Sequence, residues 1–193
     1  MEVCGEAENG AEALSAITVL LPDAIVSDIS MPGMNGIEFL KNMKALHPKI
    51  VAVVLSMHDE NTYAERALRA GAMGYVMKKE GTEVVVTALR KAFNGEHYIS
   101  GKVMGSILNR SLGKQKSGDA ASSSSVDLLS DRELEVFEHI GKGRDTQSIA
   151  DALHVSPKTV ETHRMHIKEK LQIKTISELT QYAALWLEHQ TAG

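Results

Sequence analysis

Residues 156–171 have the sequence SPKTVETHRMHIKEKL, which is the pattern of one amphipathic helix. The serine and proline that begin it suit an N-cap and a first helical turn. Val160, Ile167 and Leu171 recur at helical spacing and form one apolar stripe. A shorter helix is predicted over 146–153, and only two residues separate it from the first. Two helices joined by so tight a turn indicate a helix-turn-helix.

Positive charge gathers on this predicted helix, although the whole chain carries a net charge of −4. Residues 129–155 hold three basic and six acidic residues, whereas residues 156–170 hold four basic and two acidic ones. A local basic excess within an acidic protein favours contact with nucleic acid. We expect the helix N-terminus and three side chains to contact phosphates, namely those of Lys158, Arg164 and Lys168.

The outward residues Glu161, Thr162 and Met165 are expected to contact base edges. Glu161 can accept a hydrogen bond from a cytosine amino group, and the other two can touch a thymine methyl. The expected DNA-binding set is Thr146, Lys158, Thr159, Glu161, Thr162, His163, Arg164, Met165 and Lys168. The alternative is a packed helix whose charges are merely solvated. His163 and His166 could also form a metal pair, but they lack a third partner at useful spacing.

A polar stretch at residues 113–126, GKQKSGDAASSSSV, divides the chain into two parts. It cannot bury enough apolar area to offset the entropy of ordering, so we expect a flexible linker. After it, Ser130 and Glu133 form a capping box that begins a helix to about residue 140. The last helix is predicted over 177–188. The expected domains are residues 1–95, a linker helix and Ser-rich linker at 96–125, and an all-helical domain at 126–193.

Before the linker, short apolar runs alternate with helical patterns. Strands are predicted at residues 3–7, 23–28, 50–56 and 74–77, and helices at residues 10–20, 36–46, 60–70, 82–93 and 100–112. Near-continuous runs of Val, Ile and Ala between helices are typical of a parallel sheet that is covered on both faces.

Three chemically active side chains stand where predicted strands end. These are the carboxylate of Asp28, the hydroxyl of Ser56 and the ammonium group of Lys78. Because sites in open α/β sheets lie at the carboxyl ends of the strands, we expect the three to converge. The set suits phosphoryl transfer to Asp28 as nucleophile, with Lys78 and a metal neutralising the phosphoryl oxygens. Lys79 is expected to be an ordinary surface charge.

Composition narrows the class of protein further. The chain is 43% hydrophobic, and its one cysteine, Cys4, rules out an internal disulfide framework or a cysteine-based zinc site. No run reaches the ~18 apolar residues of a membrane span, and acidic residues stand where the basic region of a signal peptide belongs. We therefore expect a cytoplasmic protein without a membrane partner.

Three segments of the C-terminal part resemble the LuxR-type helix-turn-helix of NarL/FixJ-class response regulators: LSDRE (129–133), IADAL (149–153) and VSPKTVETH (155–163). The resemblance implies a four-helix domain that binds double-stranded DNA as a homodimer. The last helix, with Leu185 and Trp186, would form the dimer contact, although Trp186 also suits core packing. Two-fold symmetry then implies an inverted-repeat operator.

The N-terminal part is similar to the flavodoxin-like α/β receiver domain of the same family. By this resemblance Asp28 is the phosphoacceptor, Ser56 the switch hydroxyl, Tyr75 the switch aromatic residue and Lys78 the paired lysine. A histidine kinase would donate the phosphoryl group. Mg²⁺ would be the cofactor if the full-length receiver exists, and otherwise no cofactor is expected. Asp28 and the carbonyl of Ser30 are the expected metal ligands, which form an incomplete site.

The sequence departs from the receiver pattern at its start. A receiver opens with a strand that ends in an acidic pair, followed by a helix, whereas here Met1 already stands at the expected second strand. Glu2, Glu6 and Glu8 lie on or just after the wrong strand to replace the pair that would hold Mg²⁺. We therefore expect a first strand and helix to be missing, for instance because the start codon is assigned too far downstream, and weak phosphorylation of this form.

The leading functional hypothesis is a phosphorylation-controlled, DNA-binding transcription regulator. The alternative is a phosphorylation-independent DNA-binding or dimerisation partner. An enzyme that turns over a small substrate on Asp28 would need a substrate pocket and a complete metal site, and the sequence supplies neither. We therefore expect that the chain is not an enzyme.

Overall fold

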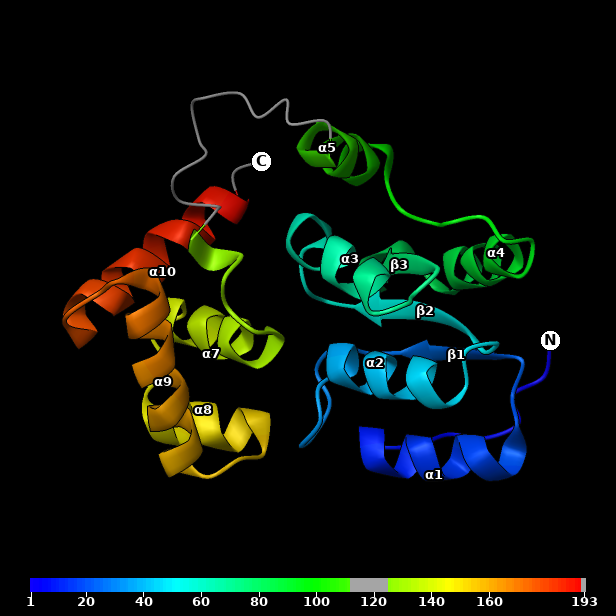
Figure 1. The fold of residues 1–193 in the computed structure, drawn as a ribbon, viewed down its shortest axis with the longest axis horizontal. Helices are drawn as coiled ribbons and strands as arrows, with labels where there is room; N and C mark the ends of the chain where they lie inside the picture. Colours follow the sequence, from blue (N-terminus) through cyan, green and yellow to red (C-terminus); the bar gives the residue numbers. More distant parts are fainter. Residues whose placement is uncertain (112–124, 192–193) are drawn as a thin grey trace. The chain divides into compact units, whose positions relative to one another are not determined.

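The computed structural model describes residues 1–111 and 125–191. It divides into two compact units, Met1–Lys114 and Gln115–Gly193, which we describe separately (Figure 1). The Ser-rich stretch that we expected to be a flexible linker lies largely at residues 112–124, outside the described residues. No helix among the described residues is long and apolar enough to cross a membrane.

Unit 1 is built on a parallel sheet of β1 (Ala24–Ser27), β2 (Val51–Ser56) and β3 (Gly74–Met77), in that order, with Ala24 opposite Val51 and Val53 opposite Gly74. Helices join and flank the strands. They are α1 (Gly10–Leu20), α2 (Gly36–Leu46), α3 (Glu60–Arg69), the short 3₁₀ helix η1 (Lys78–Glu80) and α4 (Thr82–Phe93). The parallel order confirms the α/β sheet that the apolar runs predicted.

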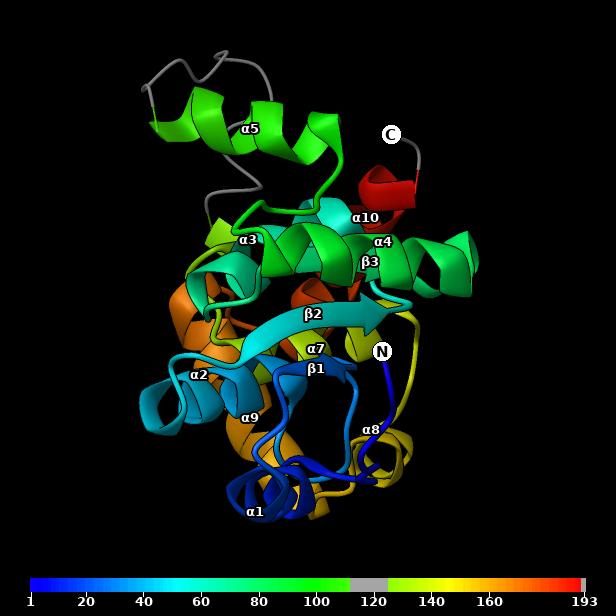
Figure 2. The same cartoon turned by 90° about the vertical axis from the view of Figure 1, so that its right-hand side faces the viewer.

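The core of unit 1 is aliphatic. Figure 2 shows α4 lying across β2 and β3, which it contacts. Val53 and Val76 of the sheet are buried against Ala88 and Ala92 of α4, whose small side chains let the helix approach closely. On the other side of the unit α1 packs on α2, as Figure 1 shows. Because the strands are parallel, their carboxyl ends lie at one edge of the sheet.

The segment before the next helix, α5 (Gly101–Ser111), is hydrogen-bonded to the outer edge of β3. Tyr98 forms a parallel bridge with Gly74, its carbonyl accepts from the N–H of Tyr75 at 2.8 Å, and its N–H donates to the carbonyl of Met73 at 2.9 Å. This pairing shields an edge that the sequence patterns left open.

The prediction of a strand at residues 3–7 is wrong, because these residues have no regular secondary structure and are exposed. A strand is held by a ladder of hydrogen bonds to a neighbour. Among the described residues β1 pairs only with β2, and residues 3–7 pair with no strand. The short run at residues 3–7 alone therefore did not suffice to form a strand.

Unit 2 is helical in its described part, with α7 (Asp131–Gly141), α8 (Thr146–Leu153), α9 (Pro157–Leu171) and α10 (Ile176–Thr191). The expected capping box is present, since the Ser130 side chain accepts from the N–H of Glu133 and the Glu133 carboxylate accepts from the N–H of Ser130. Ser156 caps α9, with proline at the next position. These local signals confirm the predicted helix starts.

The turn between α8 and α9 is as short as expected. His154 takes a left-handed conformation with φ of 52°, which ends α8, and Val155 then leads into the N-cap of α9. Val160 and Ile167 of α9 are buried, as are Ile149 and Leu153 of α8. The predicted apolar stripe therefore faces the core of unit 2, while Leu171 is only half-buried.

Candidate functional site

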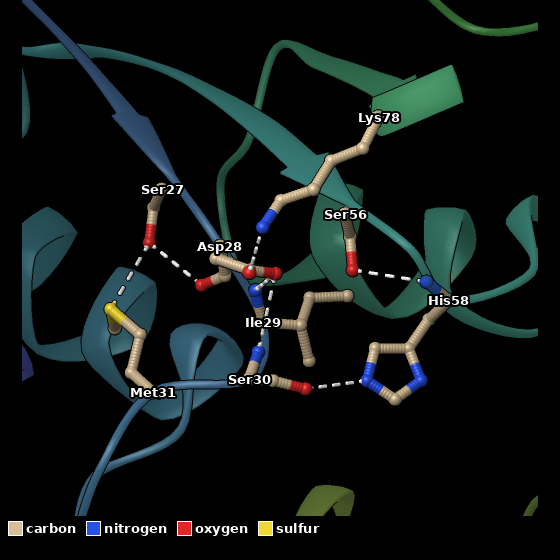
Figure 3. A network of polar contacts seen from close by, with 8 residues as sticks. All are labelled: Ser27, Asp28, Ile29, Ser30, Met31, Ser56, His58 and Lys78. Carbon is tan, nitrogen blue, oxygen red and sulfur yellow. Dashed lines mark hydrogen bonds and ion pairs between the residues drawn. The ribbon is translucent and has the colours of Figure 1, made fainter.

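Asp28 follows β1, and its carboxylate is held by three donors (Figure 3). Its Oδ1 accepts from the backbone N–H of Ile29 at 2.7 Å and from that of Ser30 at 3.3 Å. Its Oδ2 is 2.6 Å from Nζ of Lys78, which follows β3. The side chain remains 26% exposed, so the ionised carboxylate is both paired and open to solvent. The structure thus brings Asp28 and Lys78 together, as their strand-end positions predicted.

Ser56 and Tyr75 converge on a residue that sequence reasoning missed, His58. The buried Oγ of Ser56 accepts from the N–H of His58 at 3.2 Å, and the hydroxyl of Tyr75 donates to its carbonyl at 2.8 Å. The Nε2 of His58 shares a hydrogen bond of 2.7 Å with Oγ of Ser30 (Figure 3). The signal was available, because His58 stands two residues after the end of β2, where the strand-end rule places site residues.

The expected Mg²⁺ ligands do not by themselves make a metal site. Asp28 contributes a single carboxylate, and both of its oxygens already accept hydrogen bonds. In the described ranges no three His, Cys, Asp or Glu side chains gather so that they could hold a metal ion. Mg²⁺ prefers several oxygen ligands in octahedral geometry, so the donors present here do not fit it alone. The chemistry that the site offers through its own residues is nucleophilic attack by Asp28, with positive charge from Lys78 beside it.

On α9 the side chains expected to contact bases are accessible. Thr162 is exposed and Met165 is 48% exposed. The hydroxyl of Thr162 donates to the carbonyl of Lys158 at 3.0 Å, which satisfies its donor within the helix. Glu161 is also exposed, but its Oε1 accepts from Oγ1 of Thr146 at 2.6 Å. Thr146, at the start of α8, is therefore joined to the exposed face of α9.

The cations of α9 differ in accessibility. Lys158 is exposed and Lys168 is partly exposed, as phosphate contacts require. The side chain of Arg164 is only 14% exposed, and its Nη1 lies 3.6 Å from Oε1 of Glu161. Oγ1 of Thr159 is 2.7 Å from Oγ of Ser156 and belongs to the helix cap. The structure therefore places Arg164 and Thr159 in roles within the protein that the periodic pattern did not reveal.

Two other members of the expected sets lie inside unit 2. His163 is half-buried, and burial, followed by the charge of Arg132, lowers the pKa of its imidazole. Trp186 is 7% exposed and packs edge-on against Phe137 at 5.5 Å between ring centroids, so it belongs to the core. Leu185, at 48% exposure, is the expected dimer-contact residue that remains on the surface.

Together, the α/β unit with a lysine-paired aspartate and the helix-turn-helix unit with an exposed α9 define a DNA-binding regulator with a receiver-type module. Comparison with known families agrees. Residues 1–90 match the response regulator receiver domain, and residues 127–183 match the luxR family of bacterial regulatory proteins.

Individual proteins match over nearly the whole chain. Oxygen regulatory protein NreC of Staphylococcus haemolyticus (strain JCSC1435) is 36% identical over 184 residues, which is 95% of this chain and 85% of the relative. Response regulator GacA of Pseudomonas syringae pv. syringae (strain B728a) is 37% identical over 179 residues, 93% of this chain and 81% of the relative. The chain belongs to the NarL/FixJ class of response regulators, with a receiver domain and a LuxR-type helix-turn-helix domain.

Solved structures share the fold. RcsB from Salmonella enterica serovar Typhimurium, bound to promoter rprA in the presence of the phosphomimetic BeF3⁻, aligns with a TM-score of 0.57 at 23% identity, covering 95% of this chain and 85% of that one. A two-component response regulator of the LuxR family from Aurantimonas sp. SI85-9A1 aligns with a TM-score of 0.52 at 27% identity, covering 57% of this chain and 79% of that one. The expected fold class is therefore confirmed.

Proposed function

We propose that this chain is a transcription regulator that accepts a phosphoryl group on Asp28 from a histidine kinase and binds an inverted-repeat operator as a homodimer through α9. The observation that carries the first half is the 2.6 Å pair between Lys78 and the part-exposed Asp28 carboxylate at the carboxyl ends of β3 and β1. In this proposal residues 1–95 form the receiver, residues 96–125 the connection and residues 126–193 the DNA-binding domain.

The phosphoryl step follows from the residues present. The ionised carboxylate of Asp28 attacks the phosphorus, the bond from phosphorus to the nitrogen of the kinase histidine breaks, and the nitrogen keeps the electron pair. The product is an acyl phosphate on Asp28. Lys78, already beside Oδ2, offsets the negative charge of the incoming phosphoryl oxygens, which otherwise repel the carboxylate. The buried hydroxyl of Ser56 is the nearby donor for a phosphoryl oxygen.

The DNA half rests on the exposed face of α9. Lys158 and Lys168 supply phosphate contacts, which position the domain without reading sequence. Glu161, Thr162 and Met165 lie on the exposed face where a major groove would meet the helix. Leu185 of α10 supplies an exposed apolar side chain for the contact between two copies.

The experiment that tests the proposal has two arms. Full-length chain is treated with acetyl phosphate, with and without Mg²⁺, and the labelled aspartate is trapped and mapped by mass spectrometry. We expect a label on Asp28 and none in Asp28→Asn, a nearly isosteric variant. In parallel, bound sequences are selected from random double-stranded DNA, with and without acetyl phosphate. Enrichment of an inverted repeat supports the proposal, and absence of any enriched sequence contradicts it.

A second candidate function is DNA binding that is independent of phosphorylation. Within residues 1–111 and 125–191 the set of Mg²⁺ donors around Asp28 is incomplete, which favours this function because receivers typically use Mg²⁺ to accept the phosphoryl group. The two functions differ in one readout. The second function is supported if the wild type binds the operator with the same affinity with and without acetyl phosphate, and if Asp28→Asn binds equally well. The first function is supported if acetyl phosphate changes the affinity of the wild type and Asp28→Asn abolishes this change.

A further inference from the structure

We propose that Glu161 recognises one C·G base pair in each half-site, and that Thr146 and Arg164 are the residues that position its carboxylate. The inference rests on the proposed function, since it assigns a base to one residue of the proposed DNA-binding helix. It goes further by naming the base pair that should be invariant in each half-site and the two side chains on which that preference depends.

The two oxygens of Glu161 have different environments. Oε1 accepts from the hydroxyl of Thr146 at 2.6 Å and lies 3.6 Å from Nη1 of Arg164. Within residues 1–111 and 125–191 no hydrogen bond reaches Oε2, and the side chain is 53% exposed. One oxygen is therefore fixed by the protein, and the other is left to accept a hydrogen bond from a partner outside the chain.

The fixed oxygen matters because the side chain is held before DNA arrives. An unrestrained glutamate loses rotamer entropy when it is immobilised at an interface, which costs about 0.5–1.5 kcal/mol. Thr146 belongs to α8 and Glu161 to α9, so their hydrogen bond also fixes the side chain against a second helix. The reading group is thus pre-organised by the helix-turn-helix itself.

A carboxylate in a protein–DNA interface needs a compensating charge, because the phosphates repel it. Arg164 provides one, since its side chain is largely covered and its Nη1 lies 3.6 Å from Oε1 of Glu161. Arg164 also lies close enough to Asp145, the N-cap of α8, to lower the pKa of that carboxyl after the hydrogen bonds from Ser148. A covered cation between two carboxylates is placed to hold acidic side chains rather than to bind a phosphate.

The chemistry of an ionised carboxylate then selects the base. It only accepts hydrogen bonds, so it needs a donor in the major groove. Guanine and thymine offer acceptors there, whereas cytosine offers its N4 amino group and adenine its N6 amino group beside the acceptor N7. The neighbouring N7 repels the second lone-pair region of a carboxylate. Cytosine is therefore the base that Glu161 favours.

The test is selection of bound double-stranded sequences by the full chain and by variants, followed by affinities for single-base changes in the enriched site. For the wild type we expect one cytosine in each half-site, with a loss of about tenfold or more when that pair is replaced. Glu161→Gln replaces the carboxylate with an amide that can accept from the N6 amino group of adenine and donate to its N7, so the preference should move from cytosine to adenine.

Two further variants separate positioning from folding. Thr146→Val removes only the hydroxyl, and we expect it to weaken the cytosine preference several-fold while Thr146→Ser restores it. Unfolding followed by the fluorescence of Trp186, the single tryptophan, verifies that each variant keeps its fold. The matched control is Glu169→Gln, which removes an exposed acidic charge from the same helix. It should change overall affinity without changing base preference.

The outcomes separate this inference from the proposed function. An enriched inverted repeat without a cytosine dependence, or one unchanged in Glu161→Gln, overturns the inference and leaves the proposed function standing. A shift in base preference in Glu169→Gln equal to that in Glu161→Gln also overturns it, because general charge would then explain the effect. If the wild type enriches no sequence, the proposed function fails, and the inference fails with it.

Discussion

Nζ of Lys170 lies 2.6 Å from Oε2 of Glu133, which joins the C-terminal part of α9 to the first turn of α7. The same carboxylate oxygen accepts from the N–H of Ser130 and so also completes the capping box of α7. Burial acts to raise the pKa of Glu133, but the hydrogen bonds from Lys170 and Ser130 outweigh it and lower the pKa. One buried, ionised carboxylate therefore ties α9, the proposed DNA-contacting helix, to α7 of the same unit.

Lys170→Met should destabilise unit 2, because it removes the ammonium group beside the buried carboxylate of Glu133 and leaves it the more distant imidazole of His166, at 3.8 Å. We expect a loss of about 1–2 kcal/mol, below the roughly 3–5 kcal/mol of a fully buried pair, because solvent screens the partly exposed ammonium group. Urea unfolding followed by Trp186 fluorescence measures it. Lys174→Met, at an exposed position after α9, is the control. Equal losses in the two variants would contradict the prediction.

The same pair predicts a pH dependence. A carboxyl group whose pKa is lower in the folded protein stabilises the fold above its unfolded pKa, about 4.3 for glutamate. This contribution is lost as the pH falls through the lowered pKa of Glu133. We therefore expect the stability difference between wild type and Lys170→Met to be constant near neutrality and to shrink below about pH 4.3. A difference that persists undiminished in acid would show that packing, not charge, is responsible.

His163 should make unit 2 less stable in mild acid. Burial, followed by the charge of Arg132, lowers the pKa of its imidazole. Of its other neighbours, Glu133 raises this pKa and His166 lowers it. Since the unfolded imidazole binds a proton at a higher pH than the folded one, stability is complete above about pH 6.5 and falls as the pH drops below it.

Urea unfolding of wild type and His163→Gln between pH 7.5 and 5 measures the effect of His163. We expect the variant to have the flatter profile over this interval. His189→Gln, at an exposed position of α10, should leave the profile of the wild type unchanged. Parallel profiles for wild type and His163→Gln would refute the assignment.

Gly36→Ala should disrupt the loop that follows Asp28. A Cβ at Gly36 would stand 1.9 Å from the carbonyl oxygen of Asp28 and 2.7 Å from Cα of Ile29. Both are backbone atoms, which cannot rotate away as the end of a flexible side chain can. We expect a loss of about 3 kcal/mol in unit 1, measured by circular dichroism in urea, together with loss of acetyl phosphate labelling. Gly101→Ala, where a Cβ meets nothing within 4 Å, is the control and should be close to neutral.

Tyr75→Phe removes the hydrogen bond to the carbonyl of His58 and keeps the buried ring. The expected loss is about 1 kcal/mol in unit 1, the usual net value of one hydrogen bond. Hydrogen exchange should also accelerate in the loop that follows β2, because the carbonyl no longer has this donor. Tyr98→Phe serves as control, since no hydrogen bond to its hydroxyl is present in the described part of the chain. If exchange in this loop is the same in both variants, the tyrosine does not hold it.

Local signals predicted most of the fold correctly. The starts of α7 and α9 follow from Ser130 and Ser156, because a cap acts on neighbouring N–H groups and needs no tertiary structure. The apolar runs of β2 and β3 were also predicted correctly, and these two strands do have partners in the sheet. The strand expected at residues 3–7 was wrong because strand formation depends on a partner, and a single sequence does not show which pairings are made.

The candidate site was predictable only in part. Strand ends indicated Asp28, Ser56 and Lys78, and the structure brings the first and last of them into contact. The strand-end rule could also have indicated His58, but it gave no signal for the hydrogen bond of His58 to Ser30, which lies 28 residues away in the sequence. Helical periodicity also placed Arg164 on the outer face, whereas its long side chain turns back to meet Glu161.

The hydrogen bonds of Tyr98 to β3 fix the place at which the next helix, α5, begins. Besides this edge pairing, the carboxylate of Glu60 at the start of α3 accepts from the N–H of Ser100 at 2.7 Å. The residues just before α5 are thus joined to both β3 and α3, and α5 itself contacts α3. Any displacement of β3, the strand that precedes Lys78, would therefore also displace the start of α5.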